Sequence, residues 1–163
     1  MELNIGKFQD NGKCGYVLKP AYLRDDTSAS PRPTTVKITF ISAQQLPKSG
    51  QTAKGDIIDP YVSLEVFGAD GQIKKAKTKT VRDNGFNPMW EETSEFLVFD
   101  PELTMLRFAI MDEGVKEDQL VAYNTFPLNM LTLGYRHIPL YDAKHNLIPF
   151  SSLYVRVVVV GKN

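Results

Sequence analysis

The chain has 163 residues, a length that suits one domain with a full hydrophobic core. Lysine plus arginine and aspartate plus glutamate both total 19, so the formal net charge is zero. This balance argues against a general nucleic-acid binder, which would carry a basic excess. Cys14 is the single cysteine and no Asn-x-Ser/Thr glycosylation acceptor occurs, so we expect a reducing, cytoplasmic setting. No run approaches 18 apolar residues, and any membrane contact should be peripheral.

The first 30 residues differ in composition from the rest. The stretch "NGKCGYVLKP", 11–20, opens on an Asn-Gly turn signal, and "DDTSASPRP", 25–33, is a polar linker rich in serine and proline. Several apolar side chains precede that linker: Phe8, Tyr16, Val17, Leu18, Tyr22 and Leu23. They are too apolar for a fully solvated tail. We therefore expect residues 1–26 to dock on the rest of the chain or on a neighbouring molecule, and the docking to shield Cys14.

From Thr34 onward, short apolar alternations recur with turn signals between them. No long segment has helical periodicity; only "MLTLG", 130–134, suggests a single helical turn. The predicted strands are 35–42, 60–67, 73–81, 90–99, 104–111, 120–126, 135–141 and 152–160. Many short strands separated by Gly/Pro turns predict an all-β fold, an eight-stranded antiparallel sandwich.

The predicted connections bring acidic residues together. If every connection reverses the chain, the loops 43–59, 82–89 and 112–119 lie at the same end of the sandwich. They carry the oxygen-bearing side chains Asp56, Asp59, Asp83, Asn84, Asp112, Glu113, Glu117 and Asp118. Such a set is typical of a calcium site. Two other interpretations remain open: these residues are common turn formers, and Lys48, Lys54, Arg82 and Lys116 in the same loops can pair with the carboxylates.

Six stretches follow one another in a recognisable order. They are "NGKCGYVLKPAYLRDD", 11–26, "FISAQQLPK", 40–48, "IIDPYVSLEVFG", 57–68, "NGFNPMW", 84–90, "PELTMLRFAIMD", 101–112, and "GYRHIPL", 134–140. In this order and spacing the chain resembles the C-terminal part of a eukaryotic phosphoinositide-specific phospholipase C. The resemblance implies the end of the catalytic barrel at 1–26, a linker at 27–33 and an eight-stranded C2 β-sandwich at 34–163.

The resemblance also implies an enzyme that hydrolyses phosphatidylinositol bisphosphate to diacylglycerol and inositol trisphosphate. The catalytic histidines and the catalytic calcium site of that family belong to the barrel, upstream of this chain's first residue. Only His137 and His145 occur here, and neither has a nucleophile or a paired carboxylate at a recognisable spacing. We expect structural or solvent-exposed roles for both, and no catalytic activity in this chain alone.

The family pattern carries over to individual loop residues. Asp59 matches the first-loop aspartate, Asp112 matches the first aspartate after strand five, and Asp83 with Asn84 occupies the second-loop position. Gly114 departs from the pattern, because calcium-binding members usually have a second aspartate there. The resulting predicted calcium ligands are Asp56, Asp59, Asp83, Asn84, Asp112 and Asp118. Fewer charged ligands generally weaken calcium affinity.

A second set of residues predicts contact with an anionic phospholipid surface. Lys75, Lys77 and Lys79 share one face of the strand in "KKAKTKTV", and Phe86 and Val115 lie near two loop tips. The lysines could equally be a solvated, charge-protected strand edge, and Phe86 could pack under its own turn. The sequence thus predicts a membrane-docking C2 module. The competing hypothesis is a calcium-independent module that braces the catalytic barrel or binds a protein, which Gly114 favours.

Overall fold

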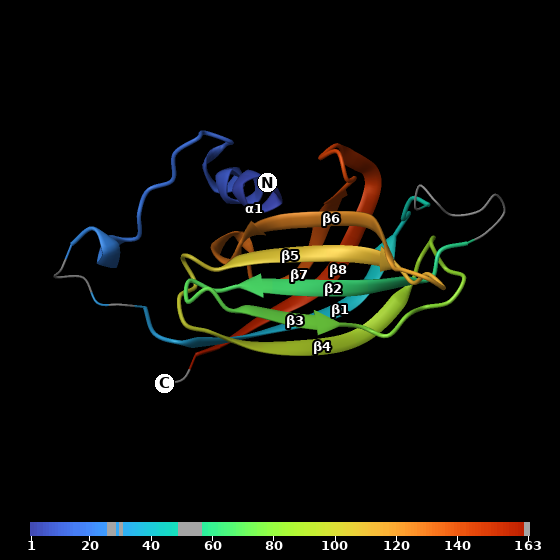
Figure 1. Ribbon diagram of the computed structural model, residues 1–163. Helices are drawn as coiled ribbons and strands as arrows, with labels where there is room; N and C mark the ends of the chain where they lie inside the picture. The colour runs from blue at the N-terminus through green and yellow to red at the C-terminus, as the bar shows by residue number, and fades with distance from the viewer. Residues whose placement is uncertain (26–28, 30, 49–56, 162–163) are drawn as a thin grey trace.

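The computed structural model describes residues 1–25, 29, 31–48 and 57–161, and in this part of the chain eight antiparallel strands form a sandwich (Figure 1). The strands are β1 (Thr34–Gln44), β2 (Pro60–Phe67), β3 (Ile73–Lys77), β4 (Met89–Val98), β5 (Met105–Asp112), β6 (Gln119–Pro127), β7 (Gly134–Tyr141) and β8 (Leu147–Gly161). Their order is β3-β2-β5-β6-β7-β8-β1-β4. The predicted all-β, eight-stranded sandwich is confirmed. No helix of the described residues is long and apolar enough to cross a membrane.

The eight strands form one continuous hydrogen-bonded order that folds into two facing layers, here called the first sheet, β3-β2-β5-β6, and the second sheet, β7-β8-β1-β4. Within the described residues, the pair Tyr123 and Tyr141 is the one backbone pairing between β6 and β7. The core therefore joins the sheets mainly through side chains. Phe108 of β5 lies edge-on to Phe40 of β1 at 6.4 Å and stacks on Phe126 of β6 at 5.6 Å. Burial of each such ring stabilises the fold by roughly 1.5–3 kcal/mol.

Three elements differ from the sequence prediction in a way that bears on the site, while the boundaries of the other strands agree within two residues. Strand β3 ends at Lys77 rather than at 81, because the Thr78 hydroxyl accepts the Val62 N–H at 2.9 Å and so replaces a backbone carbonyl. Lys79 therefore lies outside the strand. Strand β8 begins at Leu147, five residues earlier than predicted, and the helical turn is a 3₁₀ turn, η3, at Leu128–Met130.

The connections β1–β2, β3–β4 and β5–β6 meet at one end of the sandwich, at the right of Figure 1. We call this the loop end and define it by residues 45–48, 57–59, 78–88 and 113–118. Backbone hydrogen bonds join its segments: Leu46 donates to Gly85 at 3.0 Å and Glu113 donates to Asp59 at 3.0 Å. The predicted convergence of the three loops is confirmed for their described residues. Residues 49–56 of the first loop lie outside that set.

The N-terminal segment begins with a helix that the sequence did not predict. Helix α1 (Glu2–Lys7) and the 3₁₀ turn η1 (Phe8–Asn11) pack on the outer face of the first sheet, over β6 and β5 (Figure 1). Gly6 is buried so closely against β6 that an added Cβ would lie 2.4 Å from the Thr125 carbonyl oxygen. The Glu2 carboxylate lies 2.6 Å from Nε of Arg107 on β5. The expectation that this segment docks on its own sandwich is thus confirmed for residues 2–11.

The rest of the segment does not dock as expected. Tyr16 and Leu18 are 87% and 76% exposed, and Cys14 is exposed as well. A second 3₁₀ turn, η2 (Ala21–Leu23), returns to the sandwich through a hydrogen bond from the Tyr22 hydroxyl to Asp100. The expectation that docking shields Cys14 was wrong, because the contact is made by the helix upstream of it.

The close approach at Gly6 makes the docking of α1 testable. Alanine normally stabilises a helix by about 1 kcal/mol relative to glycine. We expect Gly6→Ala to release α1 instead, because the Thr125 carbonyl leaves no room for a methyl group. Hydrogen exchange of residues 2–7 should then become faster. Gly15→Ala is the control, since nothing lies within 4 Å of its Cβ position. Unchanged protection of α1 in Gly6→Ala would contradict this packing.

Candidate functional site

Asp59, the residue before β2, joins the first and third loops through its backbone. Its N–H donates to Oδ1 of Asp112 at 2.8 Å, and its carbonyl accepts the Glu113 N–H at 3.0 Å. Pro60 lies opposite Asp112 in the pairing of β2 with β5, which brings the two aspartates together. Asp112 therefore uses one carboxylate oxygen to hold the adjoining loop.

The Asp59 carboxylate is occupied on both oxygens. Oδ1 accepts the backbone N–H of Asp83 at 2.7 Å, and Oδ2 accepts a hydrogen bond from Nη1 of Arg82 at 2.8 Å. Burial alone would raise the pKa of Asp59, but these two donors lower it, and the pKa lies below the ordinary aspartate value. Asp59 is thus a carboxylate kept ionised by donors from the second loop.

Arg82 connects two carboxylates of different loops. Its Nη1 lies 2.8 Å from Oδ2 of Asp59, and its Nη2 lies 2.7 Å from Oε2 of Glu113. The side chain is 68% exposed, so the bridge lies at the surface of the loop end. A planar guanidinium suits this arrangement, because it carries five N–H donors in fixed directions.

A second cluster lies around Asp118. Oδ2 of Asp118 accepts the Tyr61 hydroxyl at 2.6 Å, and Oδ1 accepts the Gly114 N–H at 3.3 Å. Nζ of Lys77 lies 3.8 Å from both Asp118 and Glu113, and 3.6 Å from the centre of the Tyr61 ring. The hydrogen bond from Tyr61 is the main cause that lowers the pKa of Asp118, against the opposing effect of burial. On Tyr61, burial and then this hydrogen bond raise the pKa of the phenol.

Gly114 stands where the family pattern expects a second aspartate, and the structure excludes a side chain there. An added Cβ would lie 2.2 Å from the carbonyl oxygen of Glu117. That neighbour is backbone and cannot rotate away. The third loop turns too tightly at Gly114 to present any carboxylate from this position.

The other predicted calcium ligands have local roles. Oδ1 of Asn84 accepts the Asn87 N–H at 3.0 Å, which is a turn-forming bond. Asp83 has a left-handed backbone, with φ of 50°, and contributes its N–H to Asp59 rather than its carboxylate. Asp56 lies outside the described residues. Among those described, no group of three His, Cys, Asp or Glu side chains is arranged to hold a metal ion.

The described residues of the loop end therefore do not fit calcium as they are arranged. Their carboxylates converge, as the sequence predicted, but the guanidinium of Arg82, the ammonium of Lys77 and several N–H groups occupy them. This arrangement corresponds to the alternative in which cations of the same loops pair with the acidic side chains, for Arg82 among the cations named there. Lys77, at the end of β3, is a further partner.

The predicted lysine face is divided between two environments. Lys75 and Lys77 are exposed on the outer face of the first sheet, as the alternation predicted, but both lie near carboxylates. Lys75 pairs with Glu65 at 2.7 Å, Glu65 lies 3.4 Å from Arg107, and Arg107 pairs with Glu2 of α1. These lysines thus share the face on which α1 docks. Lys79 is exposed beyond the end of β3, at the loop end.

The two predicted loop-tip residues both point into solvent. Phe86 is 71% exposed and Val115 is fully exposed. Phe86 does not pack under its turn, although its carbonyl accepts the Gln45 N–H at 2.8 Å and holds the loop in place. The loop end therefore presents two apolar side chains on hydrogen-bonded loops.

Sequence reasoning assigned no role to Tyr61, counted Glu113 only among the acidic side chains of the converging loops, and named Arg82 only as a possible partner of the acids. Tyr61 follows the "IIDP" stretch as a strand residue, and its side chain is 5% exposed. The signal that could have revealed Tyr61 was its position next to an acidic turn. A buried tyrosine hydroxyl needs a hydrogen-bond partner, and a nearby carboxylate can accept that hydrogen bond.

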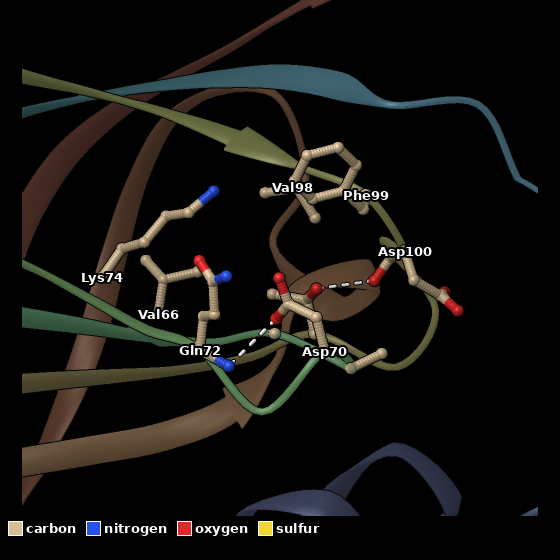
Figure 2. A pocket seen from close by; sticks show the side chains of 10 residues that line it. Val66, Asp70, Gln72, Lys74, Val98, Phe99 and Asp100 are labelled. Atoms are coloured by element: carbon tan, nitrogen blue, oxygen red, sulfur yellow. Dashed lines mark hydrogen bonds between the residues drawn. The ribbon is translucent and has the colours of Figure 1, made fainter.

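Among the described residues several hollows lie away from the loop end, and two of them contrast in size. One, at the opposite end, has about 20 Å³ of space, enough for one water molecule (Figure 2). Two contacts lie among its lining residues. The Asp70 carboxylate accepts the Gln72 N–H at 3.0 Å, and Nζ of Lys74 lies 5.3 Å from the centre of the Phe99 ring. The other is an open groove of about 190 Å³ between η1, β6 and β7, beside Gln9, Asn124 and Arg136. Neither contains a recognisable catalytic set among the residues described.

The two histidines have structural contacts. Nδ1 of His145 forms a hydrogen bond with the Tyr123 hydroxyl, which joins the β7–β8 turn to β6. His137 is exposed and stacks on Tyr154, with ring centres 4.5 Å apart. Both observations agree with the structural or solvent-exposed roles expected from the sequence.

The bond between Tyr61 and Asp118 predicts a pH-dependent stability. We expect Tyr61→Phe to lower the free energy of unfolding by about 1 kcal/mol at pH 7, because it removes a hydrogen bond to a carboxylate. Since the folded pKa of Asp118 is depressed, this contribution is present above the unfolded value near ~4 and is lost as pH falls through the folded pKa. Urea unfolding at neutral and acidic pH measures the difference, with the half-exposed Tyr135→Phe as control. A deficit that persists undiminished in acid would contradict this pairing.

Comparisons with known proteins agree with this architecture. Residues 34–142 match the C2 domain family. The human protein named inactive phospholipase C-like protein 2 is 38% identical over 173 residues, which cover 99% of this chain and 15% of that protein. The Xenopus laevis 1-phosphatidylinositol 4,5-bisphosphate phosphodiesterase delta-4 is 40% identical over 170 residues, which cover 98% of this chain and 22% of that protein.

A solved structure extends the likeness to three dimensions. The crystal structure of L. pealei PLC21 matches with a TM-score of 0.79 and 31% identity, over 96% of this chain and 21% of that one. The chain thus spans only about a fifth of the length of the relatives it matches. The sandwich, the converging loops and these matches together show that the chain belongs to the C2 domain family, and that its whole length is similar to a region of phosphoinositide phospholipases C and phospholipase C-like proteins.

Proposed function

We propose that the chain is a C2 module that docks a larger phospholipase C-type protein on anionic phospholipid, peripherally and from the cytoplasmic side. The observation that carries this proposal is the exposure of Phe86 and Val115 at the tips of hydrogen-bonded loops. Lys116 follows Val115 and is exposed, and exposed Lys79 belongs to the same loop end. Apolar tips beside cations suit an interface of acyl chains and anionic headgroups.

The energies involved favour shallow insertion over simple charge attraction. A buried phenylalanine or valine side chain contributes roughly 1.5–3 kcal/mol, whereas a lysine near an anionic surface contributes about 1 kcal/mol. Lys75 and Lys77 should add little, because they already lie beside carboxylates. We therefore assign the lipid contact to the loop end and a smaller, long-range role to the lysine face.

The activity of the parent protein follows from the likeness and is part of the proposal. The delta-4 relative is named a phosphodiesterase of phosphatidylinositol 4,5-bisphosphate, and the human relative is named inactive. We propose that residues 1–26 are the end of the catalytic barrel of such a parent, and that hydrolysis of the lipid headgroup belongs to the barrel. Membrane docking by the C2 module is compatible with both kinds of relative.

A bracing role is the second candidate function, and the N-terminal segment favours it. Helix α1 packs on β6 through Gly6, and an open groove of about 190 Å³ lies beside it, between η1, β6 and β7. A further part of the barrel packed in this groove would extend the contact that α1 already makes with the sandwich. The groove and α1 lie away from the loop end, which remains available for contact with lipid. Bracing of the barrel and docking on a membrane are therefore compatible.

The lipid contact can be tested at the loop tips. We expect Phe86→Ser and Val115→Ser each to weaken binding to phosphatidylserine vesicles about tenfold, which corresponds to roughly 1.4 kcal/mol of lost insertion. Phe99→Ser is the matched control, because Phe99 is 52% exposed at the opposite end of the sandwich. Vesicle co-sedimentation of the whole chain gives the affinities.

Two outcomes would count against the proposal. Equal losses in Phe86→Ser and Phe99→Ser would show a nonspecific effect of surface hydrophobicity. Failure of the unaltered chain to bind anionic vesicles at low salt would leave the bracing role as the function of the module.

A further inference from the structure

We propose that Arg82 is the resident cation of the loop end: its guanidinium takes the place that the sequence predicts for calcium, makes the loop end insensitive to calcium, and presents its remaining N–H donors to a lipid phosphate. The first two parts stand on the geometry of the loops alone. The contact with a lipid phosphate rests on the proposed membrane docking.

The first step is the position of the guanidinium. It lies between a first-loop carboxylate and a third-loop carboxylate, 2.8 Å from Asp59 and 2.7 Å from Glu113. These are the two loops whose carboxylates a calcium ion would have to join. Arg82 itself belongs to the second loop, so a single residue connects all three loops of the loop end.

The second step is that the oxygens around Arg82 are already used. Both oxygens of Asp59 accept hydrogen bonds, one from Arg82 and one from the backbone of Asp83. Gly114 cannot supply the missing carboxylate, because the Glu117 carbonyl lies where its Cβ would be. A calcium ion needs six to eight oxygens, and each one taken from this set would first have to lose its present donor.

The third step concerns what Arg82 leaves for a ligand. Two nitrogens of the guanidinium face carboxylates, yet the side chain is 68% exposed. The guanidinium has five N–H donors, so the remaining ones can bind a phosphate oxygen from the solvent side. Phe86 and Val115, at the tips of the second and third loops, would bring such a phosphate to the same surface.

The calcium part is tested in solution, without lipid. For the unaltered chain we expect no change in melting temperature when about 1 mM calcium replaces a chelator. Arg82→Gln should melt at a lower temperature, because Asp59 and Glu113 lose their shared partner, and calcium should restore part of the loss. Lys116→Gln is the control: it removes the same charge from an exposed loop-end lysine.

Two results in solution would overturn the proposal. One is an unaltered chain that gains as much melting temperature from calcium as Arg82→Gln does. The other is an Arg82→Gln variant that melts like the unaltered chain and ignores calcium. Arg82→Lys distinguishes charge from geometry, since an ammonium cannot reach both carboxylates as a planar fork does, and we expect it to recover only part of the stability.

The phosphate part is tested on phosphatidylserine vesicles in the presence of chelator. We expect Arg82→Gln to bind about tenfold more weakly than Lys116→Gln, since a guanidinium–phosphate contact is directional and a lysine near the surface acts only as a charge. Equal binding of the two variants would overturn the phosphate contact. If the unaltered chain does not bind vesicles, the proposed docking fails, while the melting experiment still decides the role of Arg82.

Discussion

Packing between the inner faces of the two sheets is the constraint on which the loop end depends. In the described part of the chain a single pairing, Tyr123 with Tyr141, joins β6 to β7, so contacts such as Phe40 with Phe108 hold the sheets in register. The β1–β2 and β3–β4 loops each cross from one sheet to the other. Their side chains can meet at fixed distances only because this core fixes the spacing between the sheets.

The sequence predicted those parts of the structure that depend on local pattern. All eight strands follow from a period of two, and the convergence of the acidic loops follows from strand reversal. Helix α1 could not be predicted in this way, because six residues are too few to form a stable helix alone and the contacts of Gly6 and Glu2 with the first sheet support it. The shortened β3 likewise depends on one hydroxyl, that of Thr78, which no pattern reveals.

The acidic loops show where a correct local prediction stops short of a function. The positions of Asp59 and Asp112 were predicted, but their partners depend on side-chain geometry between distant residues. The same holds for the lysine face: the predicted alternation is confirmed for Lys75 and Lys77 but not for Lys79, which lies beyond β3. Lys75 belongs to a row of charges that runs through Glu65 and Arg107 to the N-terminal helix. In both regions a charged side chain pairs with an opposite charge of the same fold. The apolar side chains at the loop tips are therefore the ones most available to a binding partner.

The tight turn at Gly114 has a consequence for how such a domain can change over evolutionary time. A single substitution to aspartate would place a side chain on the Glu117 carbonyl, so it would be selected against before it offered any new ligand. An aspartate here would require the loop to take another path, and a calcium ion would also require release of the carboxylates that Arg82 holds. A calcium site at this loop would therefore take several coordinated mutations rather than one substitution.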